Sequence, residues 1–108
     1  MSMKVIAEIS CCTPGAPPLP EEARDVLAGR FKALADPARV AIVNLLAGSD
    51  ELCVCVLTDQ LGLSQGTVSH HLRILREAGL VDVNRRGTWA FYRLVPESVA
   101  QLSRALAA

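Results

Sequence analysis

Two short helical segments separated by three residues are the feature that most constrains the fold of this chain. Apolar residues at helical spacing predict one helix over residues 54–61 and another that begins after Ser64 and runs to Ala78. Gly62 is a typical helix stop, and Ser64 is a good N-cap. Two helices joined by a turn this tight are typical of a helix-turn-helix.

The spacing of apolar residues changes directly after this pair of helices. Residues 80–95 alternate apolar with polar side chains around a turn at residues 85–88, which predicts a β-hairpin. Further helices are expected over residues 20–34, from Pro37 to the stop at Gly48, and from Pro96 onward. The second of these is nearly all apolar and is expected to form the centre of the core. The predicted fold class is mainly α with a small β-hairpin (α+β), a winged helix-turn-helix.

The chain divides into an arm and one domain. Residues 13–20 contain four prolines and one glycine, so we expect residues 1–20 to be a flexible N-terminal arm that carries Cys11-Cys12. Residues 21–108 form the predicted winged helix-turn-helix domain, which is long enough to bury a core. No apolar run reaches the roughly 18 residues that span a bilayer, and no signal peptide is evident. We therefore expect a cytoplasmic protein whose thiols stay reduced.

The helix after Ser64 has one apolar and one polar face. Val68, Leu72 and Leu75 fall together and are expected in the core. The first turn of such a helix approaches base edges in the major groove, where Gln pairs with adenine and Thr touches the thymine methyl. An alternative is a solvated polar face, and His71, at the edge of the apolar face, is expected to be packed and hydrogen-bonded. The residues predicted to read bases are Gln65, Thr67, Ser69 and His70, and those predicted near phosphates are Ser64 and Arg73.

Positive charge gathers in the same part of the chain. The whole chain has no net charge, but residues 64–93 carry five arginines against Glu77 and Asp82, a net charge of +3. Arg85 and Arg86 at the tip of the hairpin are predicted to contact phosphate or enter the minor groove. A solvated turn is the alternative for these two. The charge distribution therefore favours a nucleic-acid contact along the helix and the hairpin.

Four cysteines occur in two tight pairs, Cys11-Cys12 on the arm and Cys53 with Cys55 at the start of the helix over residues 54–61. In a reducing compartment such cysteines favour metal or redox chemistry over a disulfide framework. Soft thiolates beside a DNA-reading helix indicate that the protein senses a thiophilic ion. Buried structural cysteines and incidental thiols on a tail are the alternatives for the two pairs.

Helix geometry restricts how Cys53 and Cys55 share one ion. Residues two apart in a helix point about 200° away from each other. Either the helix starts after these cysteines, or binding unwinds its first turn, or only one of them joins Cys11 and Cys12. We favour a site of Cys11, Cys12 and one of the other two, within one chain or across a dimer.

Three segments carry a resemblance to a known family: Phe-Lys-Ala-Leu-Ala-Asp-Pro-Ala-Arg (31–39), Glu-Leu-Cys-Val-Cys (51–55) and the run from Leu63 to Val81. They resemble the ArsR/SmtB family of metal-responsive repressors over residues 21 to about 106. The resemblance implies a homodimer formed through the first and last helices, which binds a palindromic operator as a transcriptional repressor. Residues 21–108 would then serve both DNA binding and dimerisation.

Cys-Val-Cys at residues 53–55 is similar to the arsenic-responsive members of that family. The resemblance implies As(III) or Sb(III) as inducer, no organic cofactor, and metal ligands drawn from Cys11, Cys12, Cys53 and Cys55. Thr58 stands where those members often carry a third cysteine, so the third ligand is expected on the arm. Arsenite, antimonite and methylated arsenicals stay open as inducers, and methylated forms need only two thiolates.

Other sensors and other classes of protein are less consistent with the sequence. The last helix has Glu97 but no histidine, which disfavours a zinc, cobalt or nickel site there. Cadmium or lead bound by four thiolates, or a thiol-redox switch on the same fold, remains as the alternative. An enzyme is not expected, because the chain has no Cys-x-x-Cys motif, no phosphate-binding loop and no acid–base residue beside either cysteine pair.

Overall fold

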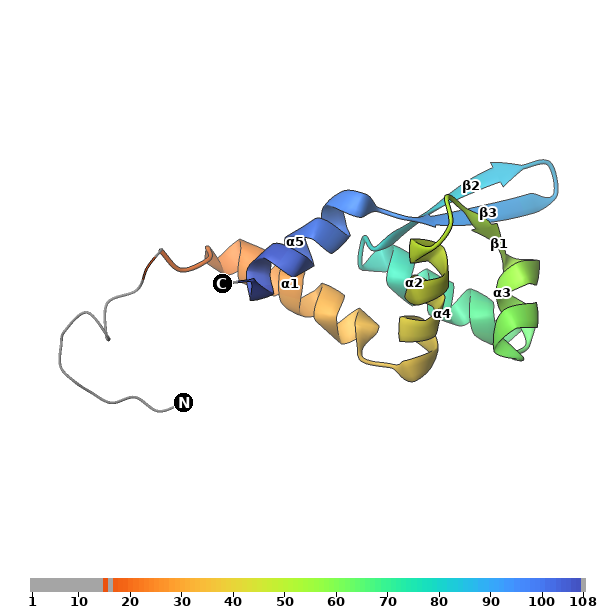
Figure 1. Cartoon of the computed structure of the whole chain (residues 1–108), viewed down its shortest axis with the longest axis horizontal. Helices are drawn as coiled ribbons and strands as arrows, with labels where there is room; N and C mark the ends of the chain where they lie inside the picture. The colour runs from red at the N-terminus through yellow and green to blue at the C-terminus, as the bar shows by residue number, and fades with distance from the viewer. Residues whose placement is uncertain (1–14, 16, 108) are drawn as a thin grey trace.

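The computed structural model describes residue 15 and residues 17–107 of the chain. Five helices and a small sheet follow one another in the order α1 (Glu21–Leu34), α2 (Pro37–Ala47), β1 (Leu52–Cys53), α3 (Val54–Leu61), α4 (Gln65–Glu77), β2 (Val81–Arg86), β3 (Trp89–Leu94) and α5 (Pro96–Leu106). Helices α1 and α5 pack together at one end of the domain, and the β2–β3 hairpin projects from the other (Figure 1). The helix-turn-helix α3–α4 lies at the hairpin end, so the predicted winged helix-turn-helix is confirmed.

The residues at the helix ends have the capping roles that the sequence predicted. The Asp36 carboxylate accepts hydrogen bonds from the backbone N–H groups of Ala38 and Arg39, and Pro37 occupies the first turn of α2. Gly62 ends α3 at a φ of 66°, in the left-handed region that favours glycine. Ser64 caps α4 as predicted, although α4 ends at Glu77, one residue earlier than expected.

The core forms around the inner face of α4. Val68, Leu72 and Leu75 are fully buried, which confirms the predicted apolar face. Helix α2 lies at the centre as expected, because it packs against α1, α3, α4 and β3. Not every apolar residue of this helix is buried, since Val40 is 53% exposed. Only one stripe of α2 can face its neighbours, and Ile42 and Leu46 occupy that stripe.

The sheet has a strand that the sequence did not predict. Strands β2 and β3 form the expected antiparallel hairpin, with Val81 opposite Leu94 and Arg86 opposite Trp89. Strand β1 adds to the outer side of β3, which gives the order β1-β3-β2. In this third strand Cys53 pairs with Phe91. The segment that carries the cysteines is therefore hydrogen-bonded to the wing before it enters α3.

None of the helices in residues 17–107 combines the length and apolar character needed to cross a membrane.

Candidate functional site

The residues predicted to contact DNA share one exposed face of α4. Ser64, Gln65, Thr67, Ser69, His70 and Arg73 are all exposed, on the side of the helix away from the buried stripe. The Ser64 hydroxyl accepts from the Thr67 N–H at 3.2 Å and donates to the Thr67 hydroxyl at 2.9 Å. Arg73 lies one turn from His70, with its guanidinium 3.4 Å from the imidazole Nδ1. The helix therefore offers an amide, hydroxyls and a cation on one accessible surface.

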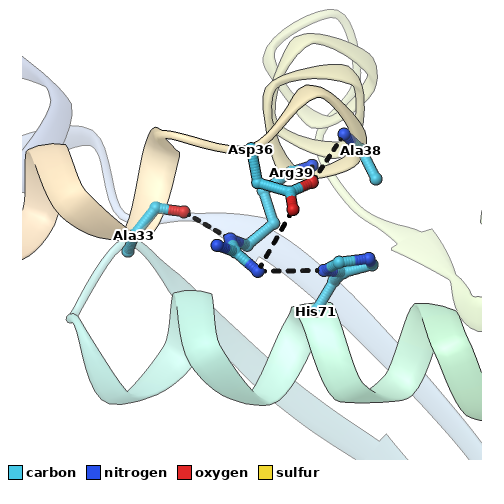
Figure 2. A network of polar contacts seen from close by, with 5 residues as sticks. All are labelled: Ala33, Asp36, Ala38, Arg39 and His71. Carbon is cyan, nitrogen blue, oxygen red and sulfur yellow. Dashed lines mark hydrogen bonds and ion pairs between the residues drawn. The ribbon is translucent and has the colours of Figure 1, made fainter.

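His71 points away from that surface and into a polar network (Figure 2). The Arg39 guanidinium donates through Nε to the carbonyl oxygen of Ala33 at 2.6 Å. The same group lies 3.1 Å from Nδ1 of His71 and 3.8 Å from the Asp36 carboxylate. Because arginine is a donor only, the His71 Nδ1 accepts this bond. The prediction of a packed, hydrogen-bonded His71 is confirmed, and the network ties α4 to the junction between α1 and α2.

The Asp36 carboxylate at this junction is held in its charged form. Partial burial opposes ionisation and by itself would raise the pKa of Asp36. The hydrogen bonds from Ala38 and Arg39, together with the charge of Arg39, more than offset that effect and lower the pKa of Asp36 below its ordinary value. The N-cap of α2 is consequently strongest when Asp36 is ionised.

The two arginines of the wing have different surroundings. Arg86 forms an ion pair with Glu51, and its guanidinium carbon lies 3.9 Å from the centre of the Phe91 ring. Arg85 is exposed and has no ion pair within residues 17–107. Arg86 therefore ties the wing to the segment before β1, although its side chain remains 51% exposed, and Arg85 makes no such ion pair among the described residues.

The two cysteines of Cys-Val-Cys lie together. Cys53 ends β1 in extended backbone, with φ −83° and ψ 162°, and Cys55 lies in the first turn of α3. Their Cα atoms are 5.4 Å apart, and their sulfurs are joined as a disulfide, whereas the sequence led us to expect reduced thiols. Cys53 precedes the helix, so the divergence of side chains two residues apart within a helix does not separate it from Cys55. Cys11 and Cys12 lie outside the described residues.

A groove brings the cysteines and the DNA-facing residues together, and the sequence did not indicate it. The cavity, of about 540 Å³, lies between the start of α3, the first turns of α4 and the wing. Its lining includes Cys53, Cys55, Thr58, Gln65, Ser69, Arg85, Trp89 and Tyr92. The Thr58 hydroxyl donates to the Cys55 carbonyl oxygen at 2.8 Å, so it is bound to its own helix. The part of the chain that the structure describes has no cluster of three His, Cys, Asp or Glu side chains placed to hold a metal ion.

Comparison with known proteins identifies the family. Residues 36–83 match the model described as bacterial regulatory protein, arsR family. An uncharacterised helix-turn-helix transcriptional regulator of Methanocaldococcus jannaschii is 46% identical over 72 residues, which cover 67% of this chain and 81% of that protein. The chain belongs to the arsR family. It is thus a transcriptional repressor of the winged helix-turn-helix type and not an enzyme.

Two further relatives are named for resistance to different elements, arsenic and cadmium. The arsenic resistance transcriptional regulator ArsR1 of Pseudomonas putida is 52% identical over 67 residues, which cover 62% of this chain and 52% of that protein. A cadmium resistance regulator, a CadC homologue of Staphylococcus aureus, is 42% identical over 72 residues, which cover 67% of this chain and 60% of that one. The chain therefore spans little more than half the length of these two relatives.

A solved structure supports the fold. The homodimeric winged helix-turn-helix domain of a possible ArsR-family regulator from Mycobacterium bovis superposes with a TM-score of 0.69 at 35% identity, covering 79% of this chain and 78% of that one.

Proposed function

We propose that the protein is a homodimeric repressor that binds palindromic operator DNA and releases it when cysteine thiolates bind trivalent arsenic or antimony. The observation that carries this proposal is the position of Cys53 and Cys55. They lie together at the start of α3, in the same groove as Gln65 and Ser69 of the recognition helix. The name of the arsenic regulator from P. putida supports arsenic as the inducer.

One end of the domain is suited to dimerisation and the other to DNA binding. Leu19, Val26 and Leu106 are 46%, 51% and 76% exposed at the end where α1 and α5 pack together. An apolar surface of this kind is suited to a second copy of the chain. A two-fold dimer would present its two α4 helices to half-sites one turn of DNA apart, about 34 Å. The exposed face of α4 and Arg85 of the wing would then meet bases and phosphates.

Trivalent arsenic favours three thiolates, and the described residues bring together two. Cys53 and Cys55, once reduced, supply one pair, and we propose that Cys11 or Cys12 supplies the third ligand, from the same chain or its partner. Soft thiolates select soft ions, which is consistent with this set. No carboxylate or histidine within residues 17–107 completes a three-ligand cluster with the pair.

Binding at this pair acts on both DNA-contacting elements. Cys53 is held in register with Phe91 of the wing, and Cys55 begins the helix that is followed, after one tight turn, by α4. An ion that prefers a different spacing of the two sulfurs shifts β1 against β3 and α3 against α4. Release follows if the ion binds the DNA-free arrangement more tightly.

The test is operator binding by fluorescence anisotropy, with arsenite, antimonite and cadmium titrated against the reduced protein and the four single Cys→Ser variants. We expect arsenite to release the operator from the native protein, and Cys53→Ser or Cys55→Ser to abolish the response. Loss of the response in Cys11→Ser or Cys12→Ser would identify the third ligand. If a variant with serine at all four positions still releases DNA on arsenite, the proposal is wrong.

A thiol-redox switch is a second candidate, favoured by the disulfide between Cys53 and Cys55. In that case peroxide alone would release the operator from the reduced protein, and a dithiol reductant would restore binding. Release by cadmium but not by arsenite would instead favour the cadmium sensor that the S. aureus relative's name suggests.

A further inference from the structure

We propose that Arg30 of α1 and Ser98 of α5 are positioning residues for operator binding. Together they fix the C-terminal end of the recognition helix α4 against the two helices that we place at the dimer interface. The inference rests on the proposed function, because it requires a dimer on palindromic DNA. It adds the residues that set which separation of half-sites the dimer accepts.

The end of α4 is held by side chains from two other helices. The last carbonyl groups of a helix have no partner within the helix and need one from outside. The Arg30 guanidinium donates through Nε to the carbonyl oxygen of Ala78 at 3.1 Å. The Ser98 hydroxyl donates to the carbonyl oxygen of Gly79 at 2.6 Å. Helices α1 and α5 therefore each bond to the backbone that directly follows α4.

Both donors are themselves held in place. Ser98 is only 4% exposed, so water does not compete for its hydroxyl. Arg30 also donates through Nη1 to the side-chain oxygen of Gln101 on α5, which fixes the direction of the guanidinium. A Cβ atom at Gly79 would lie 3.2 Å from Nη2 of Arg30, so the glycine leaves room for this close approach. A cation at the C-terminal end of a helix is also favoured by the helix dipole.

The same arginine lies in the surface that we propose for the second copy. Arg30 and Gln101 line a groove of about 550 Å³ between α1 and α5, together with Leu19, Val26 and Ala105. A second copy seated there would cover the Arg30–Gln101 contact and exclude water from it. Hydrogen bonds are stronger where water is excluded, so dimerisation would tighten the hold on α4.

A small change at this end of α4 has a large effect at the other end. The helix has 13 residues and is about 20 Å long. A tilt of about 10° about its C-terminal end moves its first turn by about 3.4 Å, which is one base-pair step of DNA. Gln65 and Thr67, which we propose as base readers, lie in that first turn. The bonds from Arg30 and Ser98 therefore control where the base-reading residues of the two copies lie.

The test compares two DNA duplexes that differ only in the separation of their half-sites. A palindromic duplex is selected from a random pool with the native protein, and a second duplex carries one additional base pair at its centre. The insertion moves the half-sites apart by about 3.4 Å and rotates them by about 35°. We expect the native protein to bind the second duplex at least about thirtyfold more weakly by fluorescence anisotropy.

Arg30→Met and Ser98→Ala should reduce this discrimination. Each variant should bind the selected duplex about tenfold more weakly, because α4 is no longer held in one orientation. Each should also distinguish the two duplexes by less than about fivefold, since a looser helix accepts either separation. Variants are compared where circular dichroism shows a folded protein and sedimentation shows a dimer.

Two further variants separate positioning from other roles. Arg24→Met is the matched control, because it removes the same charge from an exposed position of α1, and it should leave both affinities within about twofold. Arg30→Lys keeps the charge but not the fork that bonds Ala78 and Gln101 together, so it should restore only part of the discrimination. The salt slope should be native in Arg30→Met and Ser98→Ala, since neither residue is placed to contact a phosphate.

The outcomes distinguish this inference from the proposed function. If Arg30→Met and Ser98→Ala discriminate between the two duplexes as the native protein does, the inference is wrong and the proposed function stands. A reduced salt slope, or a loss of affinity fully explained by dimer dissociation, would also overturn it. If the native protein selects no palindrome, the proposed function fails and the inference falls with it.

Discussion

Replacing Arg39 with methionine tests whether the network in Figure 2 holds the recognition helix against the rest of the domain. Methionine keeps most of the aliphatic stem but removes the guanidinium. The Arg39 side chain is only 15% exposed. Two hydrogen bonds are lost, one to the carbonyl of buried Ala33 and one to His71. Each hydrogen bond from a charged donor contributes about 1.5–3 kcal/mol. Partial access of water lowers the sum, so we expect a loss of about 2–4 kcal/mol in the free energy of unfolding.

Urea denaturation followed by circular dichroism measures this loss. Protein concentration is kept constant, because dimer dissociation contributes to the stability that is observed. Arg24→Met is the control, since Arg24 is exposed on α1, and it should change stability by less than about 0.5 kcal/mol. A loss below about 0.5 kcal/mol in Arg39→Met would refute the reasoning.

A double-mutant cycle separates the bond to His71 from the bond to Ala33. Arg39→Met and His71→Phe are measured singly and together. If Arg39 acts partly through His71, the combined loss is smaller than the sum of the single losses by about 0.5–3 kcal/mol. Strict additivity would show that the two side chains act independently, despite the 3.1 Å between them.

Three further outcomes follow from other parts of the structure. The pKa of Asp36 is lowered, so its charge stabilises the fold above the ordinary pKa of the group, and this stabilisation is lost as the pH falls through the pKa of the folded protein. The difference in melting temperature between the native protein and Asp36→Asn should therefore shrink as the pH is lowered from about 7 to about 2.5. Gly79→Ala, at a φ of 79°, should cost about 1–2 kcal/mol in urea denaturation, whereas Gly29→Ala should not destabilise. Arg85→Ala should weaken operator binding across all sequences and reduce the salt slope by about one, measured by anisotropy.

Local sequence signals were sufficient for most of the helices and for the hairpin. Asp36-Pro37, Gly62 and Ser64 act through hydrogen bonds and backbone angles within a few residues, so their roles could be predicted without a tertiary structure. The apolar stripe of α4 was predicted for the same reason, because a helix repeats every 3.6 residues whatever it packs against. These signals place the polar residues of α4 on an outward face.

Contacts between distant segments could not be predicted in this way. Strand β1 is two residues long and is held by pairing with β3, some 40 positions along the chain, so no local pattern marks it. The ion pair between Arg86 and Glu51 depends on that pairing too, and it distinguishes Arg86 from its neighbour Arg85. Within the sequence these two arginines are equivalent residues of one turn.

The cysteines show the same division most clearly. The sequence by itself determined that Cys53 and Cys55 stand at the start of a helix before a recognition helix, because residue type and helix boundaries are local properties. Only the tertiary structure decided that they meet, since the sheet holds Cys53 in extended backbone outside the helix. It also decided that they share a groove with Gln65 and Trp89, because that groove is formed where three segments, separate along the chain, pack together.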